Sequence, residues 1–124
     1  MIKKEITLCG KQIHVAYCYA TEISFKILTD EDINDYMQEA YSVIQAERMP
    51  DIGKSVKLIL SAITAYYESK SEEPPISSKE LLYESTPTEI GNALGIILGM
   101  RVEFYYVPNG EPSTKEEARE EKNA

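Results

Sequence analysis

The sequence has few of the residue types that many enzymes and nucleic-acid-binding proteins depend on. Among its 124 residues there is one histidine, His14, and there are two cysteines, Cys9 and Cys18. His14 lies on a predicted strand, beside neither a serine elbow nor a reactive-cysteine signature, so we do not expect a hydrolase that acts through histidine. Thirteen Lys and Arg against 21 Asp and Glu give a formal charge of −8. An acidic surface of this kind repels nucleic acids and acidic membranes.

The sequence also lacks a long hydrophobic run. Its longest apolar stretch, residues 90–100, is interrupted by Asn92 and followed by Arg101 and Glu103. A membrane-spanning helix needs about 20 mainly apolar residues, so none is expected. The first ten residues alternate and carry charges instead of forming the apolar core of a secretory signal, which predicts a cytoplasmic protein.

The two cysteines are too far apart in the predicted structure to form a disulfide. Cys9 lies beside the turn of a predicted hairpin and Cys18 lies at its far end, so both are expected to be free thiols. His14 and Cys18 are likewise separated by roughly 13 Å along one strand, too far to share a metal ion. The glycine-containing stretch of residues 91–99 lacks the Lys-Ser/Thr ending of a phosphate loop. We therefore predict no cofactor, no metal and no catalytic residues.

What the sequence does contain is typical of a single folded domain over residues 1–110. Hydrophobic residues make up 43% of the chain, with six glycines and six prolines. Apolar residues alternate at Ile6 and Leu8 and again at Ile13, Val15 and Tyr17, which predicts a hairpin within residues 1–19 with its turn around residues 9–12. An isolated hairpin is marginal in water, so it must lie on helices or on another chain's strand.

Residues 20–107 are predicted to be helical. Thr21 is expected to cap a short helix that contains Ile23, Ile27 and Leu28, and Thr29 to start a second helix. Further helix starts are predicted where a capping residue precedes an apolar run, at Asp51, at Ser77 and at Thr86-Pro87-Thr88-Glu89. The fold class is thus α+β, mainly α, with the hairpin packed on about four to five helices. Residues 111–124 contain no large apolar side chain and are expected to form a flexible acidic tail.

The last predicted helix is the most informative element. It could extend from residue 87 to about residue 106, although residues 102–107 are β-prone and could form a strand. This helix contains three glycines, Gly91, Gly95 and Gly99, and each lowers its stability by roughly 1 kcal/mol relative to alanine. Their spacing of four residues would place them on one face of the helix. The other side carries Ile90, Leu94, Ile97, Leu98 and Phe104. We favour burial of one face and a subunit or partner contact on the other; the alternative is a central core helix with no partner.

The order of these segments resembles a known family. Residues 6–15 (ITLCGKQIHV) and 19–25 (YATEISF), followed by acidic helices and a closing apolar helix, resemble the small tail assembly chaperones of long-tailed bacteriophages and prophages. The likeness covers roughly residues 5–107. The resemblance implies a non-enzymatic protein that coats the helical tape-measure protein before the tail tube polymerises and that tends to self-associate. In many of these phages a frameshifted longer form recruits the tail tube protein.

The contact surfaces on this interpretation are the hairpin and the glycine face. The residues proposed for them are Gly91, Gly95, Gly99, Tyr106, Ile13, Val15 and Tyr17. A different class of function is an acidic interaction module or a DNA-mimicking inhibitor of a basic host enzyme, whose carboxylates would form rows along an elongated surface. A small enzyme that uses only carboxylates is disfavoured, because no Asp/Glu pair lies in an apolar setting that would perturb its pKa.

Overall fold

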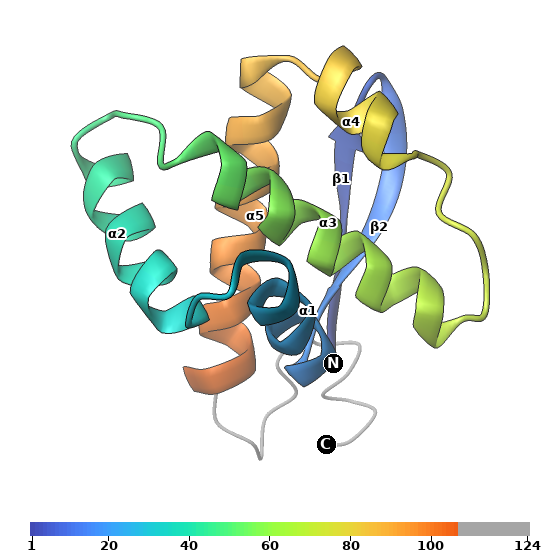
Figure 1. Ribbon diagram of the computed structural model, residues 1–124, viewed down its shortest axis with the longest axis horizontal. Coiled ribbons are helices and arrows are strands. Elements are labelled where there is room, and N and C mark those ends of the chain that lie inside the picture. Colours follow the sequence, from blue (N-terminus) through green and yellow to red (C-terminus); the bar gives the residue numbers. More distant parts are fainter. Residues whose placement is uncertain (107–124) are drawn as a thin grey trace.

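The computed structural model describes residues 1–106, which form an N-terminal hairpin packed on five helices (Figure 1). The predicted α+β, mainly α fold is confirmed. In chain order the elements are β1 (Ile2–Leu8), β2 (Lys11–Tyr17), α1 (Tyr19–Thr29), α2 (Ile33–Gln45), α3 (Ile52–Ser69), α4 (Ser78–Glu84) and α5 (Pro87–Tyr106). The tail predicted for residues 111–124 lies outside the described residues.

The hairpin is closed by a two-residue turn, shorter than the four residues expected. Cys9 and Gly10 both have positive φ, 55° and 73°. Two consecutive left-handed residues make a turn whose twist matches that of the flanking strands. Pairing runs from Leu8 opposite Lys11 to Ile2 opposite Tyr17.

Only one face of the hairpin is covered by helices. α3 packs against β2, α5 packs against β1, and α1 packs against α3. In Figure 1, α3 crosses in front of the hairpin and α5 runs beside β1. The core is formed by the inward side chains of these elements, such as Ile6, Ile13, Leu58 and Ile97, all at most 2% exposed. The hairpin thus gains from helices the apolar cover that two strands alone lack.

The first two helices begin and end at different residues from those predicted. α1 begins at Tyr19 after the N-cap residue Cys18, and the buried Thr21 is the third helical residue, whose hydroxyl accepts from the Cys18 N–H (3.2 Å) in a capping box. The Thr21 hydroxyl donates to the carbonyl of Ala16 (2.9 Å), which ties α1 to β2. Thr29 ends α1, and α2 is capped by Asp32, whose side chain accepts from the Asn34 N–H (2.8 Å). Thr21 therefore holds the third position of a capping box and not the N-cap, and Asp32 caps α2 in place of Thr29.

The other predicted helix starts are confirmed by their hydrogen bonds. The side chain of Asp51 accepts from the Lys54 N–H (3.0 Å), and that of Ser77 accepts from the Glu80 N–H (3.0 Å). At the start of α5, Thr86 and Glu89 each accept from the other's backbone N–H (3.2 Å each). This capping box opens a helix that continues through Tyr106, so residues 102–106 are helical and not a strand.

Candidate interaction surfaces

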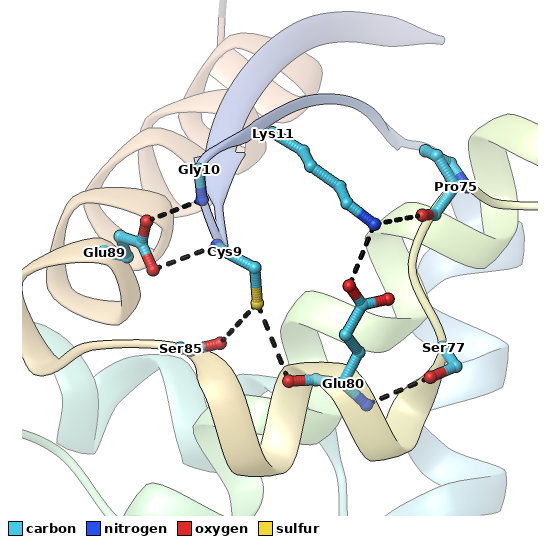
Figure 2. A network of polar contacts seen from close by, with 8 residues as sticks. All are labelled: Cys9, Gly10, Lys11, Pro75, Ser77, Glu80, Ser85 and Glu89. Carbon is cyan, nitrogen blue, oxygen red and sulfur yellow. Dashed lines mark hydrogen bonds and ion pairs between the residues drawn. The ribbon is translucent and has the colours of Figure 1, made fainter.

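The turn of the hairpin is held to α5 by the carboxylate of Glu89. Its Oε1 atom accepts from the N–H of Cys9 (3.0 Å) and its Oε2 atom accepts from the N–H of Gly10 (3.2 Å), as Figure 2 shows. These bonds, together with the N–H of Thr86, favour the charged carboxylate and lower the pKa of Glu89 below its ordinary value. Glu89 therefore caps α5 and binds the turn at once, which fixes α5 beside β1.

A second set of contacts joins the same turn to α4. The Lys11 ammonium lies 2.8 Å from Oε2 of Glu80 and donates to the carbonyl of Pro75 (3.1 Å) (Figure 2). The bond from Lys11 lowers the pKa of Glu80. The Cys9 thiol donates to the carbonyl of Glu80 (3.6 Å) and lies 3.8 Å from the Ser85 hydroxyl. Both cysteines are free, as predicted. These polar groups bind one another and join the hairpin turn to α4 and α5. The cluster therefore has a structural role and holds in place the elements that form the groove described next.

A groove of about 580 Å³ lies between β1 and α5. Glu5, Ile6 and Thr7 line it from β1, and Gly91, Gly95 and Ile96 are among the α5 residues that line it. Gly95 and Gly99 are exposed, and a Cβ atom added at either would meet nothing within 4 Å. The glycine face thus points away from the core, and its role as a contact surface stays a prediction.

The three hairpin residues predicted for the contact surface belong to the core instead. Ile13, Val15 and Tyr17 have no exposed surface. They lie on the covered face of β2, because one face of this small sheet packs on the helices. Their assignment to a contact surface is therefore wrong. Tyr106, in contrast, is 68% exposed at the end of α5.

The hydroxyl of the buried Tyr17 binds the carboxylate of Glu22, which also binds α5. The Tyr17 hydroxyl donates to Oε2 of Glu22 (2.7 Å), and the hydroxyl of Tyr105 donates to Oε1 of the same side chain (2.6 Å). Burial, and then the bond to Glu22, raise the pKa of Tyr17 above its ordinary value. The same causes, in the same order, raise the pKa of Tyr105 to about 12. Glu22 therefore orients α1 against the end of α5.

This orientation leaves an apolar surface on α1 exposed. Tyr19, Ile23 and Ile27, spaced four residues apart, are 64%, 61% and 75% exposed. Phe25 is the large α1 side chain that enters the core. The available signal was that α1 has apolar residues at both Phe25 and Ile23, more than one face of a short helix can bury.

The α1 surface is hollowed where it meets the start of α2. Its groove has a volume of about 380 Å³, with Tyr19, Ile23, Ile27 and Ile33 as apolar lining. The charged side chains that complete the lining are Glu22, Lys26 and Asp32. An apolar floor with charges of both signs at its border is typical of a site for an amphipathic segment.

His14 lies on the face of the hairpin opposite to the core and is partly exposed. Its ring stacks on Tyr66 with the ring centroids 4.8 Å apart, and its Nε2 atom lies 3.5 Å from Oε2 of Glu5. Its backbone N–H donates to the hydroxyl of Tyr67 (3.2 Å). Within residues 1–106, no three His, Cys, Asp or Glu side chains gather in a way that could hold a metal ion.

Comparison with protein-family models, curated proteins and solved structures finds no match to this chain. The helices of residues 1–106 include none with both the length and the apolar character that a membrane crossing requires.

Proposed function

We propose that this chain is a non-enzymatic tail assembly chaperone that binds the tape-measure protein and helps to recruit tail tube subunits in the cytoplasm of a bacterial host. The observation that carries the proposal is the exposed apolar stripe of Tyr19, Ile23 and Ile27 on α1, with its groove. Large apolar side chains that remain exposed in a hollowed, charge-bordered surface are typical of protein-binding sites. The sequence resemblance supplies the identity of the client.

The shape of the groove suits a helical client. An amphipathic helix binds a groove through apolar anchors spaced one turn apart, and the stripe on α1 repeats at that spacing. The charged lining residues Glu22, Lys26 and Asp32 could fix the direction of a helix with charges beside its apolar stripe. A long helical protein would offer many such stripes, so several chaperone copies could bind along it.

The test is co-expression with the product of the long helical reading frame that a tail gene cluster would place downstream. Ile27→Glu should abolish co-purification of that client and return it to the insoluble fraction, because a charge replaces an exposed anchor. The matched control is Leu82→Glu on α4, where the replaced side chain is 62% exposed but lies outside the groove. This control should bind like the parent chain.

Two results would contradict the proposal. One is equal client binding by the Ile27→Glu variant and the parent chain. The other is binding that is lost in high salt and unaffected by Ile27→Glu, because this would indicate recognition of the acidic surface by a basic partner.

A further inference from the structure

The two edges of the hairpin differ in how their backbone groups are satisfied. On the outer edge of β2, the N–H of His14 donates to Tyr67 and the carbonyl of Ala16 accepts from Thr21. The sheet has only two strands, so β1 also has an outer edge. Within residues 1–106, no backbone hydrogen bond from another element reaches that edge. The edge of β1 is thus an open template for a further strand.

The pairing register identifies the backbone groups that point outward from β1. Hydrogen-bonded and non-hydrogen-bonded pairs alternate along an antiparallel ladder. The N–H of His14 is bonded to Tyr67, so His14 and its partner Glu5 form a non-hydrogen-bonded pair. The N–H and C=O of Glu5 therefore point away from β2, as do those of Lys3 and Thr7, two residues to either side.

We propose that β1 pairs antiparallel with β1 of a second copy of this chain, which creates a four-stranded sheet across a twofold axis. The charges on the strand select the register. When Lys3 lies opposite Glu5 of the other copy, twofold symmetry repeats the pair, and each dimer gains two cross-strand ion pairs on the uncovered face. The neighbouring registers with the same backbone bonding place Glu5 opposite Glu5, or Lys3 opposite Lys3, and are repulsive.

The central pair of this register, Lys4 opposite Lys4, does not prevent the two strands from pairing. Lys4 lies opposite Lys4 of the other copy, and Lys4 forms an ion pair with Glu103 of its own α5 (3.4 Å), which offsets its charge. The groove beside the β1 edge leaves space for the incoming strand.

The open face of α5 contributes to the same interface. α5 packs on β1, so joining the two strands brings the two α5 helices together in antiparallel orientation. Gly95 lies beside Ile6 in the groove, and Glu103 reaches Lys4, so Gly99 lies near the level of the twofold axis. Glycines at these positions let two backbones approach closely where side chains would collide. This assigns the exposed glycine face to a second copy, and the assignment does not depend on the α1 groove.

Charge reversal tests the register with the full-length chain in analytical ultracentrifugation. Lys3→Glu and Glu5→Lys should each weaken dimerisation by about tenfold or more, because each makes both cross-strand pairs repulsive. An equimolar mixture of the two variants should recover the parent affinity, because every pair in the mixed dimer joins opposite charges again. Lys57→Glu and Glu68→Lys make the same charge changes on exposed positions of α3 and should leave dimerisation unchanged.

Amide hydrogen exchange locates the interface by residue. The amides of Lys3 and Glu5 should exchange slowly in concentrated solution and fast after dilution, whereas the Lys4 amide, bonded to β2, should stay protected in both. Gly95→Leu should abolish the dimer while leaving the circular dichroism of the chain unchanged, because the added side chain has free space within one copy.

Three outcomes would overturn the dimer: a monomer at millimolar concentration, a dimer whose mixed variants show no recovery, or Lys3 and Glu5 amides that are slow at every dilution. The last would show an edge already covered within one chain. None of these outcomes bears on client binding by α1, so the two proposals fail separately.

Discussion

Helices α3 and α5 cover the same face of the hairpin, but their other sides have different surroundings. α3 lies between β2 and α1, and its middle turns are buried on nearly every side, including the small residues Ser55, Ser61 and Ala62. α5 is just as apolar, yet Gly95, Ile96, Gly99 and Val102 are exposed. The small residues Ser55, Ser61 and Ala62 of α3 therefore serve packing inside the protein, whereas Gly95 and Gly99 of α5 face outward.

The largest losses of stability should follow from truncating the buried side chains of α3 and of α5. Leu58→Ala in α3 and Ile97→Ala in α5 should each lower the free energy of unfolding by about 2–5 kcal/mol, because each leaves a cavity in the core. Ile96→Ala, one residue away on the open side of α5, should cost much less. Urea denaturation measures all three. An Ile96→Ala cost equal to that of Ile97→Ala would remove the distinction between the two sides of α5.

A smaller loss of stability is expected at the hydrogen bond by which Tyr67 of α3 binds the outer edge of β2. Tyr67→Phe removes the hydroxyl that accepts from the N–H of His14, so the free energy of unfolding should fall by about 1–2 kcal/mol. The exposed Tyr83 on α4 provides the matched control, because Tyr83→Phe removes a hydroxyl that solvent can replace. Exchange of the His14 amide should accelerate in the Tyr67 variant alone. An unchanged rate would show that the bond does not protect this edge.

Replacing the exposed glycines of α5 should stabilise the single copy. Gly95→Ala and Gly99→Ala should each raise the free energy of unfolding by about 0.5–1 kcal/mol, because alanine restricts the unfolded chain and its Cβ meets no neighbour. Gly10→Ala is the contrasting control and should be destabilising, because Gly10 has a φ of 73°. Thermal unfolding at low protein concentration measures the effect. A loss of stability at Gly95 would mean that its face is packed within one copy.

The smallest effect concerns the pH dependence of the bonds that hold α5 beside β1. The pKa of Glu89 is lowered in the folded protein, so its contribution to stability is present above the unfolded pKa and is lost as the pH falls through the folded pKa. Glu89→Gln should therefore reduce the loss of stability below about pH 5 while lowering stability at pH 7. Denaturation midpoints at pH 7 and pH 3.5 test this. Parallel pH profiles for the parent and the variant would contradict it.

Local features of the fold could be predicted because short stretches of chain determine them. The caps at Asp51 and Ser77 and the box at Thr86 and Glu89 bond to backbone groups within three residues. The alternation along β1 and β2 likewise identified the hairpin. The predicted N-cap role of Thr21 was wrong, because Cys18 is the N-cap and the Thr21 hydroxyl binds both the Cys18 N–H and the carbonyl of Ala16 on β2.

The candidate surfaces were harder to predict, since exposure depends on the other elements. Sequence spacing placed Gly95 and Gly99 on one face of a helix, and that face is exposed. The same reasoning could not tell that Ile13 and Val15 would be buried while Ile23 and Ile27 would not. All four are apolar and regularly spaced, so their pattern alone does not distinguish a core face from an open one.

The sequence by itself determined the two strands, most helix starts and the glycine-bearing face of the last helix, because these follow from backbone bonding and side-chain spacing along the chain. Only the tertiary structure decided which apolar faces are covered. Burial is a property of two surfaces that meet, and α3 reaches β2 while no element of residues 1–106 pairs with the edge of β1.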